Sequence, residues 1–389
     1  MMDYFSDEKL VETQPINRAA YSDRTAWIMA EISRLVYEKL PNEKSVNDLI
    51  FELREGITNG EYENILSALE NYGRHTDIYK NNSIIDELKN ANFDFIKGFA
   101  NDGTEAILIK FEPYPGSPSM IVLAFRGTEK SVKDIRADIT CDLVSAPNFL
   151  GVEGEGKVHR GFIDAFQKVG SEIKAELAKY DGLGIPIFIT GHSLGAALAL
   201  IATRYLCADS SGATYTFGSP RVGDDIFFRN VRTPVYRVAN GADGVTRVPF
   251  GEGLSLFLAT IRYIPFNGTK NVSEWIRNRF RGYTHYGSLV YLAQKNITKK
   301  ETGLDKMNLD VKTSPSIFYK SKNMIERIIT TSGNAIVIDH SISNYSSLLM
   351  QYAKSRNINI SNSSTIPAVG AVIEDIDSPD NPFKDKSSS

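Results

Sequence analysis

The stretch IPIFITGHSLGAALALIATRYL, residues 185–206, decides how this chain folds. It opens with an apolar, β-branched run typical of a buried strand and closes with an Ala- and Leu-rich run typical of a helix. Between them, Gly191-His192-Ser193-Leu194-Gly195 fits the pattern G-x-S-x-G. A turn this tight strains the backbone of the serine, and the flanking glycines leave room for it. The pattern predicts that the Ser193 hydroxyl stands above a sheet as a nucleophile.

Strands and helices alternate on both sides of this turn, which indicates a parallel sheet covered by helices on both faces. The apolar runs predict strands at 106–111, 120–125, 185–190, 213–217, 235–239 and 335–338. The periodicity predicts helices at about 161–180 and 194–207 and a short helix near 224–230. We therefore expect an α/β fold with a mostly parallel central sheet.

The regions around this core differ from it in composition. Residues 1–95 read as a helical N-terminal extension packed on the core, with one helix over 23–40 that Pro41 ends. Residues 96–360 form the predicted catalytic domain, with inserted loops at 250–282, an apolar and basic mixture, and at 294–330, which is lysine-rich. Residues 361–389 are polar and Ser/Pro-rich, so we expect a flexible tail.

Composition excludes several classes of protein. The 389 residues include 44 basic and 47 acidic side chains, and a net charge of −3 argues against a nucleic-acid partner. Cys141 and Cys207 are too few for a disulfide framework and read as reduced core residues. No His, Cys and acid cluster has metal-ligand spacing, so we expect no metal and no cofactor.

The N-terminal residues carry acids and no apolar h-region, and no apolar run reaches the roughly 20 residues that a membrane span needs. We therefore expect a soluble protein without a Sec signal peptide, either cytoplasmic or exported by a non-Sec route.

A serine nucleophile needs a base and an acid that orients the base, in the chain order Ser, acid, His. Asp243 follows the predicted strand at 235–239 in a Gly-rich loop and is the predicted acid. Asp224 and Asp225 are alternatives, but they lie at the start of a predicted helix, where an acid caps backbone N–H groups.

The chain has five histidines that are candidates for the base, at positions 75, 159, 192, 285 and 340. Only His285 and His340 follow Asp243. His340 comes directly after the predicted strand at 335–338, and active sites gather at strand ends, so it is favoured over His285 in its aromatic surroundings. His159 is expected to be structural, and His192 is expected to point away from Ser193.

The developing alkoxide needs N–H donors. The N–H of Leu194, directly after the nucleophile, is one predicted donor. Thr128, in the loop that follows the strand at 120–125, would supply the second through its N–H and hydroxyl.

Six ordered blocks resemble one family, the class 3 lipases of the α/β-hydrolase fold. They are MIVLAFRGT (120–128), DIRADI (134–139), KVHRGF (157–162), GHSLGAALA (191–199), TFGSPRVGD (216–224) and VTRVP (245–249). The resemblance implies Ser193 as nucleophile, Asp243 as acid, Thr128 with Leu194 as oxyanion hole, and His340, in a late Asp-His pair, as base. The segment at 129–138 departs from the family because it lacks the Trp expected of a lid helix.

We therefore expect a serine carboxylic-ester hydrolase that acts on lipids through an acyl-enzyme, similar to triacylglycerol lipases. The alternatives are a phospholipase A that acts on membrane lipids and a non-catalytic lipid-binding module. The expected partner is a lipid or other ester substrate, with peripheral contact to a membrane or lipid-droplet surface as a further expectation. The oligomeric state stays open.

Overall fold

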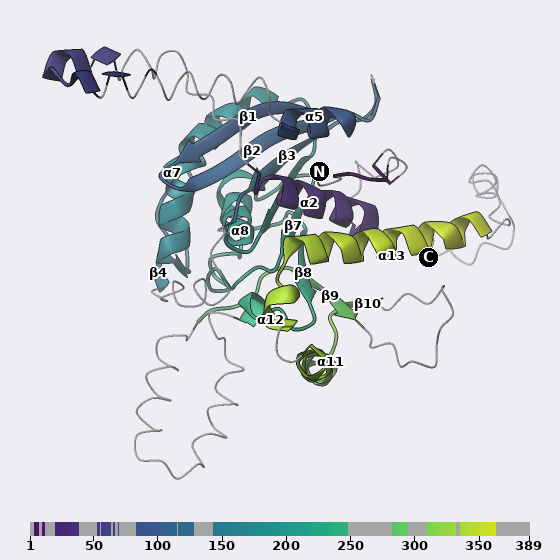
Figure 1. The fold of residues 1–389 in the computed structure, drawn as a ribbon. Helices are drawn as coiled ribbons and strands as arrows, with labels where there is room; N and C mark the ends of the chain where they lie inside the picture. The colour runs from purple at the N-terminus through teal and green to yellow at the C-terminus, as the bar shows by residue number, and fades with distance from the viewer. Residues whose placement is uncertain are drawn as a thin grey trace, which may run out of the picture.

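The computed structural model describes residues 4–7, 10–11, 20–38, 53–54, 56–63, 65–66, 69, 83–114, 116–127, 143–247, 282–294, 309–331 and 335–362. Over these residues the chain forms one eight-stranded sheet in the order β1-β2-β3-β6-β7-β8-β9-β10 (Figure 1). Its strands are β1 (Phe93–Asn101), β2 (Thr104–Phe111), β3 (Met120–Phe125), β6 (Ile187–His192), β7 (Thr214–Phe217), β8 (Val235–Asn240), β9 (Ser288–Gln294) and β10 (Leu309–Thr313).

The middle of the sheet is parallel and its two ends are antiparallel. Strands β3, β6, β7, β8 and β9 run parallel to one another, whereas β1, β2 and β10 join by antiparallel pairing. The prediction of an α/β fold with a mostly parallel central sheet is confirmed, and the topology is that of an α/β-hydrolase. Strands β4 (Leu143–Ser145) and β5 (Lys157–His159) form a separate antiparallel pair.

Helices cover both faces of the sheet and bury its apolar side chains. Helices α7 (Arg160–Leu177) and α8 (Leu194–Leu206) pack on the face that carries Leu123 and Ile189. Helices α2 (Asp23–Leu35) and α13 (Ile342–Asn362) pack against each other on the face that carries Val122 and Phe188. Burying alternate side chains on both faces explains why the central strands read as continuous apolar runs.

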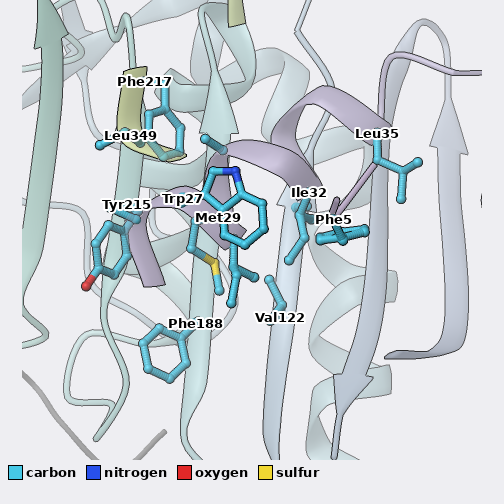
Figure 2. Packing of buried hydrophobic residues seen from close by; sticks show 14 of the residues in the cluster. Phe5, Trp27, Met29, Ile32, Leu35, Val122, Phe188, Tyr215, Phe217 and Leu349 are labelled. Atoms are coloured by element: carbon cyan, nitrogen blue, oxygen red, sulfur yellow. The ribbon is translucent and has the colours of Figure 1, made fainter. Parts of the chain in front are cut away.

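Helix α2 places N-terminal sequence inside the core. Its Trp27, Met29 and Ile32 are fully buried beside Val122 and Phe188 (Figure 2). Ser22 caps the helix by accepting a hydrogen bond from the N–H of Thr25, at 3.3 Å. Helix α2 is therefore one layer of the core.

Boundaries near the N-terminus differ from the prediction. Strand β1 begins at Phe93, so the boundary that the sequence places at residue 95 lies inside a strand. Asn92, with a φ of 60°, ends the turn that follows α5 (Ser83–Asn90) and sets the start of β1. Helix α2 ends at Leu35, five residues before the predicted end at 40.

The predicted strand at 335–338 is wrong, because these residues form the short helix α12 (Ala335–Ile338). A four-residue apolar run does not distinguish a strand from a helix. Here the Thr331 hydroxyl accepts a hydrogen bond from the N–H of Ala335, and Val337 and Ile338 are exposed instead of buried in a sheet. The short helix predicted near 224–230 is also wrong; these residues form successive turns, with Asp224 accepting from the N–H of Phe227.

The lysine-rich segment at 294–330 is not a loop throughout, which corrects the prediction of an inserted loop. Strand β10 extends the sheet by pairing with β9, and helix α11 (Ile317–Thr330) follows it. The predicted insertion at 250–282 lies almost entirely outside the described residues, and so does the tail beyond residue 362. No helix within the described ranges is long and apolar enough to cross a membrane.

Cys207 is a free, buried cysteine, as the sequence predicts. Burial raises the pKa of its thiol to about 12. Cys141 lies outside the described residues.

Candidate active site

Ser193 lies in a strained turn between β6 and α8. Its φ of 57° and ψ of −121° are rare for a residue with a side chain, and its N–H is held by the carbonyl of Phe217 at 3.0 Å. A Cβ on Gly191 would lie 2.3 Å from the Gly195 carbonyl oxygen, and one on Gly195 would lie 2.3 Å from that of Phe125. The two glycines are therefore needed for the close approach of strand, turn and helix.

The structure brings together Ser193, Asp243 and His340, the three residues that the sequence proposes as nucleophile, acid and base. His340 Nε2 lies 3.0 Å from Ser193 Oγ, and His340 Nδ1 lies 3.0 and 3.1 Å from the two carboxylate oxygens of Asp243. All three residues are buried. Such a chain of contacts lets an imidazole accept a serine proton while a carboxylate fixes its orientation.

Asp243 is held ionised by the groups around it. Its Oδ2 accepts from the Tyr345 hydroxyl at 2.7 Å, and its Oδ1 accepts from the N–H of Val245 at 2.8 Å. Burial opposes ionisation, but His340 and these two donors together keep the pKa of Asp243 below its ordinary value. Burial and the adjacent carboxylate raise the pKa of Tyr345 well above its ordinary value, so this hydroxyl keeps its proton and donates it.

Gly218 leaves room for the contact between Asp243 and His340. A Cβ on Gly218 would lie 2.8 Å from Asp243 Oδ2 and 3.0 Å from His340 Nδ1. Its φ of 59° also favours glycine.

His192 holds the loop of His340 through a hydrogen bond to its backbone. His192 Nε2 donates to the backbone carbonyl of His340 at 2.6 Å, and its Nδ1 lies 2.8 Å from the Tyr37 hydroxyl. Burial and the neighbouring His340 lower the pKa of His192 to about 3, so the ring is neutral. Because Nε2 carries the proton, Nδ1 accepts the hydrogen bond of Tyr37. His192 is thus a packing residue beside Ser193, and it fixes the backbone of His340.

The alternative residues do not reach Ser193. His285 Nε2 donates to the carbonyl of Thr246 at 2.8 Å, and burial lowers the pKa of His285 well below its ordinary value. Asp224 caps the turn at Phe227. His159 caps α7 by accepting from the N–H of Phe162 at 3.4 Å.

Of the two residues expected to supply the oxyanion donors, the structure describes only Leu194. Leu194 is the first residue of α8, where the N–H groups have no acceptor within the helix. Thr128 lies outside the described residues, one position beyond Gly127. Gly127 itself lies against the turn, since a Cβ there would be 2.6 Å from the His192 carbonyl oxygen.

Within the described part of the chain, no group of three or more His, Cys, Asp and Glu side chains has the geometry to hold a metal ion.

Sequence reasoning missed several residues that surround the three. Tyr345 lies 102 positions after Asp243, and Tyr37 lies 155 positions before His192. Asp339 was visible beside His340, but its partner Arg327 on α11 lies in the segment that the sequence assigns to an inserted loop. No motif spacing connects these positions, so the contacts emerge only from the fold.

Comparisons with known proteins find similarity to lipases and phospholipases. Residues 122–253 match a family described as lipase (class 3). A relative from Fusarium solani, named secreted mono- and diacylglycerol lipase 1, is 42% identical over 116 residues, which cover 28% of this chain and 32% of that protein. A relative from Oryza sativa subsp. indica, named phospholipase A1-II 2, is 31% identical over 166 residues, covering 33% of this chain and 41% of that protein. The chain thus spans less than half the length of the curated relatives that it matches.

Among solved structures, the mono- and diacylglycerol lipase from Aspergillus oryzae is similar with a TM-score of 0.43 and 20% identity, covering 68% of this chain and 86% of that one. The relative from Fusarium solani is named as a secreted protein. This finding contradicts the expectation from the sequence that the protein is cytoplasmic or exported by a non-Sec route. An N-terminus without an apolar h-region was too narrow a basis for that expectation.

Proposed function

We propose that this protein is a serine carboxylic-ester hydrolase that acts on lipids through an acyl-enzyme, and the match of residues 122–253 to the class 3 lipase family supports this. One observation carries the proposal: His340 lies 3.0 Å from both the Ser193 hydroxyl and the Asp243 carboxylate, at a strained strand-to-helix turn. The catalytic domain that we propose includes helix α2 and strand β1 as well as residues 96–360, because α2 packs in the core and β1 begins at Phe93. The residues from 361 to 389 follow it as the proposed tail.

In the first half of the reaction, Ser193 Oγ attacks the ester carbonyl carbon and its proton passes to His340 Nε2. Asp243 accepts the Nδ1–H of His340, which keeps Nε2 free as the base and stabilises the imidazolium that forms. The N–H of Leu194, with the N–H and hydroxyl of Thr128, stabilises the oxyanion. The ester C–O bond then breaks, and the leaving alkoxide takes the proton from His340.

In the second half, His340 takes a proton from water, and the resulting hydroxide attacks the acyl carbon. The second tetrahedral intermediate collapses as Ser193 Oγ leaves and recovers the proton from His340. The fatty acid is released and the three residues return to their starting state.

We also propose that the protein contacts a lipid surface through α11 and α12. Phe318, Ile325 and Ile329 share one face of α11 by their spacing of seven and four, and all three are exposed, Phe318 by 81%. On α12, Val337 and Ile338 are exposed, three and two residues before His340. An apolar surface that borders the base is suited to a substrate presented by an emulsion or membrane.

The test of the proposed function is fatty-acid release from emulsified diacylglycerol and triacylglycerol and from phospholipid vesicles, measured side by side. Ser193→Ala serves as the blank and is expected to lose at least about 10⁴-fold of the activity while staying folded. Retained turnover by the folded Ser193→Ala protein would overturn the assignment.

A second candidate, a phospholipase A that acts on membrane lipids, is favoured by the match to a protein named phospholipase A1-II 2. Faster release from vesicles than from emulsions would select it, and salt-sensitive binding to anionic vesicles would add support. A non-catalytic lipid-binding module is the remaining alternative. It predicts that a phosphonate ester fails to label Ser193.

The surface contact has its own test. Phe318→Asp and Ile329→Asp should weaken adsorption to emulsions by about tenfold or more while hydrolysis of a soluble short-chain ester stays unchanged. Thr330→Asp, on an exposed polar position of the same helix, is the matched control. Equal adsorption by all three variants and the wild type would contradict the contact.

A further inference from the structure

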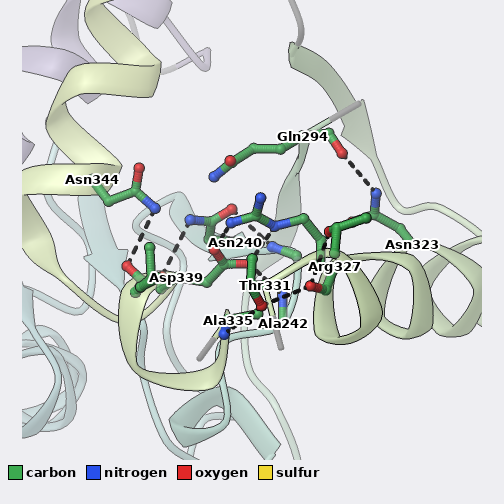
Figure 3. Close-up of polar contacts among 12 residues, drawn as sticks. Asn240, Ala242, Gln294, Asn323, Arg327, Thr331, Ala335, Asp339 and Asn344 are labelled. Carbon is green, nitrogen blue, oxygen red and sulfur yellow. Dashed lines mark hydrogen bonds and ion pairs between the residues drawn. The ribbon is translucent and has the colours of Figure 1, made fainter. Parts of the chain in front are cut away.

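Asp339 is a buried carboxylate that the proposed reaction does not use, although it directly precedes His340. Its side chain has no exposed surface. Asp339 Oδ2 accepts from the N–H of Ala242 at 2.8 Å, and its backbone carbonyl accepts from Asn240 Nδ2 at 3.2 Å (Figure 3). Each contact lies close to a member of the proposed triad, since Ala242 precedes Asp243. Asp339 thus ties the loop of Asp243 to the loop of His340.

Arg327, on helix α11, neutralises this carboxylate. Its Nη2 donates to Asp339 Oδ1 and its Nε donates to Oδ2 at 3.3 Å, in a two-point contact (Figure 3). The Arg327 side chain is only 12% exposed. A planar guanidinium that holds both oxygens fixes the direction of the carboxylate as well as its charge.

Helix α11 is itself anchored to the sheet beside these loops. Asn323, one turn before Arg327, donates through Nδ2 to the carbonyl of Gln294 at 3.2 Å, at the end of β9. A Cβ on Gly241 would lie 2.8 Å from Asn323 Oδ1 and 3.2 Å from Asp339 Oδ2. Glycine at 241 therefore permits the loop of Asp243 to approach both α11 and Asp339.

We propose that Arg327 is a positioning residue that acts through Asp339 to hold His340 in register with Asp243 and Ser193. The inference rests on the proposed function, because it assigns a role in turnover to a contact near the triad. The physical basis of this role is geometric. A small displacement of a reacting group lowers the rate of the chemical step by a large factor, while substrate binding changes little. The segment at 294–330 thereby contributes to the active site although none of its described residues touches the three.

The experiment measures kcat and KM for a soluble ester, p-nitrophenyl butyrate, with the full-length chain. Arg327→Met is expected to lower kcat by about 30- to 100-fold with KM changed by less than about threefold. Arg327→Lys, which keeps the charge but loses the two-point contact, should recover part of this loss. Glu326→Gln, on the exposed face of the same helix, is the matched control and should behave like the wild type.

A double variant distinguishes the positioning role of Arg327 from a purely structural role. Arg327→Met leaves the Asp339 charge buried and alone, which also lowers the melting temperature. In Arg327→Met/Asp339→Asn the lone charge is gone and the side-chain amide oxygen still accepts from Ala242, so we expect the melting temperature to recover and kcat to stay low. Recovery of both to wild-type values would overturn the positioning role, as would a wild-type kcat in Arg327→Met itself.

Failure of the inference is distinguishable from failure of the proposed function. A wild-type chain that hydrolyses esters with Ser193→Ala inactive, alongside a fully active Arg327→Met, overturns the inference alone. A wild-type chain that neither hydrolyses any ester nor reacts with a phosphonate overturns both.

Discussion

At Ser193 the strained turn depends on glycines within two positions of it, whereas the ring and the carbonyl of His340 are held by residues 97 and 148 positions away in the chain. Gly191 and Gly195 allow the strained turn because any side chain there would collide with backbone. His340 instead depends on Asp243 for its ring, on His192 for its carbonyl, and on Asp339 for the loop that carries it. Ser193 is thus placed by local steric constraints, and His340 mainly by a network of distant polar contacts.

This difference predicts different responses to mutation. Changes at the Ser193 turn should disturb packing and activity together, because backbone atoms must move. Changes in the network around His340 should leave the sheet intact. Each change should reduce kcat only in part, because several contacts together hold His340 in place.

The largest expected effect tests which histidine is the base. His340→Ala should lower kcat/KM by about 10³- to 10⁴-fold, because the proton of Ser193 then has no acceptor. His285→Ala removes a hydrogen bond to the carbonyl of Thr246 and should change kcat/KM by less than about tenfold. Kinetics of both variants with a soluble ester decide the matter, and the reverse ranking would contradict the choice of His340.

The next effect probes the local constraint. Gly195→Ala places a Cβ 2.3 Å from the Phe125 carbonyl oxygen, so strand β3 and helix α8 must move apart. We expect the free energy of unfolding to fall by about 3 kcal/mol and activity by about 100-fold. Gly161→Ala, an exposed helical position whose Cβ would have ordinary contacts at 3.4 Å, is the control for denaturant unfolding and kinetics. Similar stabilities for the two variants would show that the turn is not constrained as described.

A smaller effect is expected within the polar network. Tyr345→Phe removes a donor to Asp243 and the acceptor of the Asn240 N–H, so kcat should fall by about tenfold and stability by about 1 to 3 kcal/mol. Tyr352→Phe, two turns further along α13, should leave kcat unchanged. A Tyr345→Phe enzyme with wild-type kcat would exclude a role for this hydroxyl in orienting Asp243.

The last prediction concerns stability alone and is a change of slope in the free energy of unfolding against pH. His192 has an ordinary pKa of 6.5 that burial lowers to about 3 in the folded protein. Between these values the unfolded chain binds a proton that the folded chain does not, so stability is fully present above about pH 6.5 and falls as the pH drops towards 3. His192→Gln should reduce this slope by about 1.4 kcal/mol per pH unit, measured by denaturant unfolding across that range. Equal slopes would show that His192 does not remain neutral when folded.

The sheet and the turn could be predicted from sequence because their signals are local. An apolar run, a G-x-S-x-G turn and an Ala/Leu-rich run lie next to one another between residues 185 and 206. Asp243 and His340 could be proposed because chain order and the ends of apolar runs narrow the choice. The run at 335–338 was the reason for favouring His340, but it is a helix and not a strand, so the contact of His340 with Ser193 has another structural origin.

The mostly parallel sheet, the position of Ser193 and the candidates for the other two residues follow from the sequence alone. Each of these depends on periodicity or sterics between neighbours in the chain, which a sequence displays directly. That His340 and not His285 faces Ser193, and that Tyr345, His192 and the pair Arg327–Asp339 surround it, follows only from the folded arrangement. These contacts depend on which side chains, distant in the chain, are buried next to one another. Hydrogen bonds between such groups produce no periodic pattern in the sequence.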